Sequence, residues 1–124
     1  MAFRAPDSIF GPFREKDTPI LTATVMDNAT PQAVIPGTAL DTATFTLYLE
    51  KTGAIINSRN NVNIKPDISA QGVLTFPLTV ADMAIVDTTK AQEYHRALIR
   101  WTWNTSMAGS WEIRIIVDNV EKIT

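Results

Sequence analysis

The chain has no cysteine among its 124 residues. This excludes disulfides, thiolate metal sites and a cysteine nucleophile, and it favours folding in a reducing compartment. Glycine is also scarce, with five residues, which argues against a low-complexity chain. No apolar run approaches the ~20 residues that cross a bilayer, and no N-terminal stretch has the charged-then-apolar form of a signal peptide. We therefore expect a soluble protein, made in the cytoplasm, with no membrane partner.

The chain also lacks an excess of basic residues. Lys and Arg number 11 against 13 Asp and Glu, which gives a net charge of −2. Because proteins bind nucleic-acid backbones mainly through Lys and Arg, we expect no nucleic-acid partner. A chain of this length can still bury a self-sufficient core, so we expect one globular domain.

Alternating apolar and polar residues are the main structural signal. Residues 43–51 show the clearest period of two, which places Phe45, Leu47 and Leu49 on one face. Leu74 and Phe76 share a face in a later run, where Pro77 favours an edge strand or a strand end. Residues 54–59 are expected to form a short strand.

A β-hairpin is predicted near the end of the chain, where residues 94–103 and 111–117 flank a polar, Gly-containing turn. It holds all three tryptophans, which alternate with polar residues and so are expected inside. We predict an all-β, immunoglobulin-like antiparallel sandwich of about six to eight strands over residues 19–124. The residues expected to anchor its core are Phe45, Leu47, Leu49, Trp101, Trp103, Trp111 and Ile113.

Residues 1–18 have no regular period. Phe3, Phe10 and Phe13 alternate with prolines and a glycine, which discourage a helix. Two interpretations are open: a disordered terminus, or an extended N-terminal arm whose phenylalanines dock on a neighbouring subunit. Three phenylalanines are many for a solvated tail, so we favour the arm.

The hairpin face opposite the tryptophans is a candidate interface. It carries Arg96, Leu98, Arg100, Arg114 and Ile116, together with Glu112 and Asp118. One interpretation is a solvated face with weak cross-strand ion pairs. The other is a subunit contact, because two aliphatic residues are interleaved with arginines.

Residues able to carry chemistry are few. His95 is the only histidine, with Glu93 two residues away, and a lone histidine is a poor metal site. Asp82 and Asp87 lack the spacing of a calcium loop. No nucleotide-binding, hydrolase or zinc-protease motif is present. We therefore expect no enzymatic activity, no cofactor and no metal. The tryptophans could alternatively form a sugar-binding platform if they were exposed.

Several segments resemble a family of small virion proteins of tailed bacteriophages. The resemblance covers roughly residues 18–123 and rests on GAIINSRN at 53–60, GVLT at 72–75, DMAIV at 82–86, HRALIRWTW at 95–103 and WEIRIIVDN at 111–119. It implies a structural virion component with no catalytic residues.

A capsid decoration or cement protein, bound to the lattice through the arm and one sheet face, is the first expectation from this resemblance. A head–tail neck component is the second, and a tail or baseplate component is the third. The implied partners are phage capsid or neck proteins and further copies of this chain. A carbohydrate-binding module is the alternative from a different class.

Overall fold

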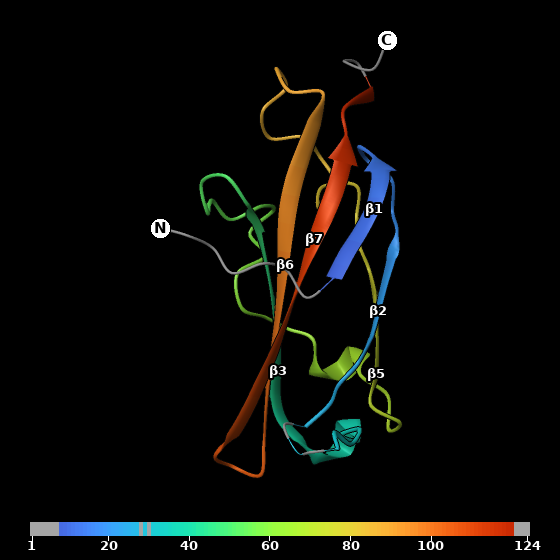
Figure 1. Cartoon of the computed structure of the whole chain (residues 1–124), viewed down its shortest axis with the longest axis vertical. Coiled ribbons are helices and arrows are strands. Elements are labelled where there is room, and N and C mark those ends of the chain that lie inside the picture. Colours follow the sequence, from blue (N-terminus) through green and yellow to red (C-terminus); the bar gives the residue numbers. More distant parts are fainter. Residues whose placement is uncertain (1–7, 28, 30, 121–124) are drawn as a thin grey trace.

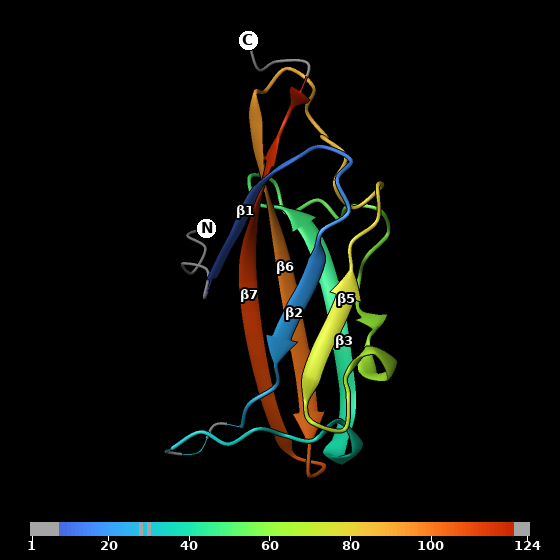
Figure 2. The ribbon, with the colours of Figure 1, turned by 90° about the vertical axis from the view of Figure 1, so that its right-hand side faces the viewer.

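The chain folds into two β-sheets that face each other, as the predicted all-β sandwich requires. The computed structural model describes residues 8–27, 29 and 31–120. Figures 1 and 2 show a larger sheet and a smaller one, with the strands of the smaller sheet in front of the larger in Figure 2. The described residues include no helix long and apolar enough to cross a membrane.

The larger sheet has five strands in the order β1-β7-β6-β3-β4, and the smaller pairs β2 with β5. In the larger sheet β6 lies between β7 and β3, and β2 and β5 alone make up the smaller sheet. The strands are β1 (Ser8–Arg14), β2 (Ile20–Thr24), β3 (Leu40–Leu49), β4 (Val62–Asn63), β5 (Val73–Pro77), β6 (Gln92–Trp103) and β7 (Met107–Asp118), and short 3-10 turns cover Gly37–Ala39 and Lys65–Asp67.

The predicted hairpin is present as β6 and β7, which pair along their whole lengths from Gln92↔Asp118 to Trp103↔Met107. Its turn is shorter than expected, because the return strand begins at Met107 rather than near Trp111. Asn104 and Thr105 have φ values of 50° and 56°, the left-handed region that asparagine tolerates better than most residues. A tight turn therefore connects the two strands, and residues 107–110 pair with β6.

Part of the predicted N-terminal arm, residues 8–14, is an extended strand of the larger sheet. They form β1, which runs parallel to β7 from Ser8↔Ile113 to Arg14↔Asp118. The register shifts between Phe10 and Phe13, so both phenylalanines pack against the core although they are three residues apart. Their rings lie 4.7 Å apart in an edge-on arrangement. Phe3 lies outside the described residues.

Residues 54–59 form only an isolated bridge from Ile55 to Tyr48 and not the expected strand. Asn57 and Ser58 have φ values of 53° and 55°, which are incompatible with an extended strand. The chain turns there, and Asn57 and Arg59 project towards Asp82 instead.

The core lies between the two sheets. Phe45, Leu47, Leu49, Trp101 and Ile113 are buried in it. Trp103 and Trp111 are half-buried and pack against its rim. Leu21, Leu74 and Phe76 close the core from the smaller sheet. Because β2 and β5 are short, they cover only part of the longer β6–β7 hairpin (Figure 2).

Candidate functional site

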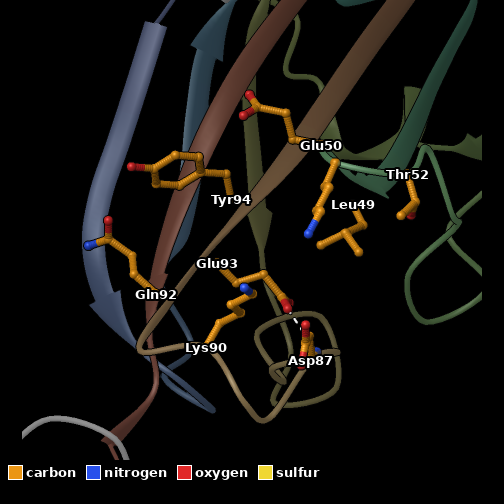
Figure 3. Close-up of a pocket in the computed structure, with 9 residues that line it drawn as sticks. Leu49, Glu50, Thr52, Asp87, Lys90, Gln92, Glu93 and Tyr94 are labelled. Carbon is orange, nitrogen blue, oxygen red and sulfur yellow. Dashed lines mark hydrogen bonds between the residues drawn. The ribbon is translucent and has the colours of Figure 1, made fainter.

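A pocket of about 340 Å³ opens where β3 ends and β6 begins. Figure 3 shows Leu49, Thr52, Lys90 and Glu93 on one side of β6, whereas Gln92 and Tyr94 project on the other. The lining residues are Leu49, Glu50, Lys51, Thr52, Asp87, Lys90, Gln92, Glu93 and Tyr94. Nothing in the local sequence pattern predicted this pocket, because its walls come from two segments about forty residues apart.

Glu93 sits beneath this pocket and organises the loop before β6. Its carboxylate accepts the backbone N–H groups of Val86 and Asp87, each at 2.8 Å. The same carboxylate lies 2.6 Å from Nε2 of His95. Each bond to a carboxylate is stronger than one between neutral groups, so Glu93 fixes residues 86–87 against the sheet.

His95 is fully buried and is not a ligand-facing group. Its Nε2 contacts Glu93, but its Nδ1 has no hydrogen-bond partner within the part of the chain that the structure describes. A catalytic base must reach the proton it removes, and this imidazole does not line the pocket. The contact with Glu93 that the sequence suggested is therefore present, and it anchors a loop.

Asp82 and Asp87 do not share a site. Asp82 is fully buried and accepts hydrogen bonds from Asn57, Arg59 and Thr79, whereas Asp87 accepts the hydroxyl and N–H of Thr89. Burial raises the pKa of Asp82, but the bonds from Arg59, Asn57 and Thr79 outweigh it and hold that pKa below its usual range. Within residues 8–27, 29 and 31–120, no three His, Cys, Asp or Glu side chains are grouped as metal ligands.

The outer face of the larger sheet carries a group of paired charges that we call the charged ladder: Glu50, Arg96, Glu112 and Arg114. Nε of Arg96 donates to Glu50 at 2.6 Å, and its Nη1 donates to Glu112. Arg114 also donates to Glu50, at 2.8 Å. Two carboxylates and two guanidiniums thus neutralise one another across β3, β6 and β7.

The contacts of the charged ladder shift the pKa values of Glu50, Arg96 and the neighbouring Tyr48. Burial raises the pKa of Glu50, but the bonds from Arg96 and Arg114 outweigh it and leave that pKa lowered. Burial lowers the pKa of Arg96, but its bonds to Glu50 and Glu112 outweigh it and leave that pKa raised. Burial and a hydrogen bond to Glu112 raise the pKa of Tyr48 to about 12. Glu50 and Arg96 are therefore held ionised near neutral pH.

The candidate interface residues separate into different environments. Arg96, a predicted interface residue, is only 3% exposed and is a buried member of the ladder. Arg114 is a half-buried member of the ladder, Leu98 and Ile116 are half-buried beside it, and Arg100 is exposed. Phe10 and Phe13 contact this chain's own core, which accounts for them without a neighbouring subunit.

Sequence reasoning placed Arg96, Arg114 and Glu112 on one face but did not connect them with Glu50. The alternation of residues 43–51 puts Glu50, which directly follows β3, on the outward side, and the missing information was that β3 and β6 are neighbours. Tyr94 and Ile9 also belong to this surface. Arg114 stacks 5.0 Å from the centre of the Tyr94 ring, and Ile9 is the register partner of Arg114.

A second pocket, of about 360 Å³, lies between β2 and β7. Trp101 and Trp111 line it together with Ala23, Thr24, Met26, Gln32 and Ser110. Trp101 is 7% exposed, and its Nε1 donates to the carbonyl of Met26. Trp111 is half-buried, so it is more accessible than Trp101.

No family model matches this chain, and no match was found among curated proteins or solved structures.

Proposed function

We propose that this protein is a non-catalytic structural component of a tailed-phage particle, with capsid decoration as its most direct role. The sequence resemblance and the all-β sandwich support this role. In this proposal the chain contacts the particle through the outer face of its larger sheet. A head–tail neck position or a tail position would use the same surface.

The observation that carries the proposal is the composition of that face. The charged ladder is internally neutral, so a partner can cover it without leaving an uncompensated buried charge. Around it, Ile9 is 62% exposed and Tyr94 is 40% exposed. Protein interfaces are enriched in Arg and Tyr, and this face carries Arg100, Arg114 and Tyr94.

The copy number per particle tests this role. Mass spectrometry of purified particles with a labelled standard would give on the order of hundreds of copies for a decoration protein and about a dozen for a neck ring. Absence of the protein from purified particles would refute the proposal.

The contacting face is tested with Ile9→Asp, which adds a negative charge beside the internally neutral ladder at an exposed position. We expect this variant to fold and to be lost from particles. Val80→Asp is the matched control, because Val80 has a similar exposed fraction, 50%, and lies in the turn after β5, outside both sheets. Equal incorporation of both variants would contradict the choice of face.

A carbohydrate-binding module is the second candidate, favoured by the pocket beside Trp111. Half-exposed indole surface next to Gln32, Thr24 and Ser110 combines a stacking face with hydrogen-bonding groups, as sugars require. Tryptophan fluorescence decides this point, because a bound sugar would shift the emission and Trp111→Ala would abolish the shift. Emission that is unchanged by a panel of host-surface sugars would exclude this candidate.

A further inference from the structure

Strand β2 has one open edge. β2 and β5 alone make up the smaller sheet, and they pair antiparallel. Figure 2 shows β5 along one side of β2 and no strand of the same sheet along the other. The backbone N–H and C=O groups at such an edge have no strand partner, so a further strand can pair with them.

The hydrogen bonds of the β2–β5 pair show which groups point to the open edge. The N–H of Val25, directly after β2, donates to the carbonyl of Gly72 at 2.9 Å. In an antiparallel pair every second residue bonds to the partner strand, and the residues between them direct their N–H and C=O groups the other way. Counted from Val25, the residues directed to the open edge are Thr24, Thr22 and Ile20. Within the part of the chain that the structure describes, no other backbone group bonds to them there.

The other edges of the two described sheets are short or blocked. β4 has only two residues. β1 contains a register shift and Pro12, which has no N–H to donate. The outer side of β5 is covered by a neighbouring segment, where the N–H of Ser69 donates to the carbonyl of Val73. β2, with the sequence ILTAT, has no proline, charge or register shift, which are the usual devices against further pairing. Its edge is therefore available for a further strand.

The pocket between β2 and β7 lies on the open side of β2. Ala23 and Thr24 line it from β2 and Trp111 from β7, whereas none of its lining residues comes from β5. Side chains alternate along a strand, so a strand paired with β2 directs every second side chain to the inner face, where Ala23 also points. One of these side chains can enter the pocket of about 360 Å³. Because no ionisable residue lines the pocket, that side chain must be uncharged.

We infer that the open edge of β2 is an acceptor site for an extended segment of another polypeptide. The segment pairs antiparallel with β2 as a third strand of the smaller sheet, and one of its large apolar side chains enters the pocket beside Trp111. The free N–H and C=O groups of β2 recur about every 7 Å, which is the repeat that a second strand presents. Backbone bonds thus hold the segment, and the pocket selects its sequence. The inference does not rest on the particle role, which concerns the outer face of the larger sheet.

A synthetic peptide with the sequence KTVTFTVTK and capped ends tests the site. As a strand it places phenylalanine and both valines on one face and the threonines on the other, and the terminal lysines oppose its aggregation. Amide and indole chemical shifts of the whole chain are followed as the peptide rises to about 1 mM, which detects weak binding. We expect shifts at Ile20, Thr22, Thr24 and the indole of Trp111. Absent shifts, or shifts confined to another surface, would overturn the inference.

Two N-methylated peptides separate pairing at the edge from binding in the pocket alone. Methyl groups on the threonines that flank phenylalanine block N–H groups that face β2 in an antiparallel pair, whereas methyl groups on the two valines block N–H groups that face away. We expect the first peptide to cause no shifts and the second to retain them. Replacing phenylalanine with aspartate should also abolish the shifts, because the charge would be buried without a partner. Equal binding of the two N-methylated peptides would contradict pairing at the edge.

Thr22→Pro removes the central donor of the edge on the protein side. Because the N–H of Thr22 points away from β5, the smaller sheet loses no hydrogen bond, and proline is tolerated in edge strands. We expect this variant to fold and to show no shifts with the peptide. Thr22→Val is the matched control, since it keeps the N–H and loses only the hydroxyl, and it should bind like the wild type.

Binding to Thr22→Pro at wild-type strength would show that the edge is not the site. If this variant does not fold, the two N-methylated peptides decide the point on the wild-type chain. Particle incorporation is measured separately through Ile9→Asp, so the two proposals can fail independently.

Discussion

The indole of Trp101 lies against the backbone of Gly109 on the neighbouring strand. A Cβ added at position 109 would lie 2.7 Å from Cε2 and Nε1 of the ring. The two residues are register partners, and the hydrogen bond from Trp101 Nε1 to the Met26 carbonyl ties the ring to the segment after β2. Gly109 thus lets the hairpin bury its largest side chain at the point where the smaller sheet ends.

We predict that Gly109→Ala destabilises the domain by about 1–3 kcal/mol, because the methyl group overlaps a ring that is held in place. Without the overlap, alanine would stabilise a strand relative to glycine by roughly 0.5–1 kcal/mol. Urea unfolding of the two proteins measures the difference in the free energy of unfolding.

The origin of this loss is checked in a Trp101→Phe background. Phenylalanine lacks the indole atoms nearest to position 109, so Gly109→Ala should cost less there, giving a coupling energy of about 0.5–3 kcal/mol. An equal cost in both backgrounds would show that the ring is not the cause.

The two-sheet architecture was predictable because its main strands alternate without interruption. Residues 43–49 and 94–103 each keep one apolar face, and β3 and β6 follow them. Strand β1 was missed because the register shift between Phe10 and Phe13 breaks the period of two. A bulge of this kind depends on the neighbouring strand, which a local pattern does not contain.

The sites were less predictable than the fold because each joins segments distant in the sequence. Glu50 and Arg96 are 46 residues apart, and only the pairing of β3 with β6 brings them together. Alternation placed Arg96 correctly on the outer face, and from this alone an exposed side chain would be expected. The other residues of the charged ladder cover Arg96, so its side chain points outward and is nevertheless buried.

Arg96 is expected to stabilise the domain through its two carboxylate partners. Arg96→Met removes the guanidinium between Glu50 and Glu112 while keeping much of the aliphatic volume. Because part-buried Glu112 then loses the Arg96 guanidinium and Glu50 keeps only Arg114, we predict a loss of about 3 kcal/mol in the free energy of unfolding. Arg100→Met is the control on the same strand, and because Arg100 is exposed its effect should stay within about 0.5 kcal/mol. Similar losses in the two variants would argue against the ladder.

Asp82 should make the stability depend on pH in the acid range. Its pKa is lowered in the folded protein, so its contribution is complete above the unfolded pKa of about 4 and is lost as the pH falls through the folded value. Asp82→Asn removes the charge that Arg59 contacts, and we predict a loss of roughly 2 kcal/mol at pH 7. The difference in the free energy of unfolding between wild type and Asp82→Asn should become smaller below about pH 4.

Unfolding by urea at a series of pH values from neutral to acid measures that gap. Asp67→Asn serves as the control, because Asp67 is exposed in the turn Lys65–Asp67. A gap that stays constant at acid pH would mean that the carboxylate of Asp82 is not the source of the stabilisation.

Glu93 is expected to hold the loop before β6 through the N–H groups of Val86 and Asp87. Glu93→Gln keeps the size of the side chain but replaces a carboxylate with an amide, which has one acceptor oxygen. In the wild type the carboxylate receives both N–H groups and contacts His95, so the variant leaves at least one part-buried donor without a strong acceptor. We predict a stability loss of about 1.5–3 kcal/mol.

Hydrogen exchange gives the more specific readout for Glu93. The amides of Val86 and Asp87 should exchange faster in Glu93→Gln by more than the global loss of stability explains, since local opening of this loop becomes easier. Amides in the middle of β6, such as Ile99, should follow the global change only. Asp87→Asn leaves both backbone bonds to Glu93 in place and should keep the two amides protected. Protection that survives in Glu93→Gln would show that the sheet, and not this carboxylate, holds the loop.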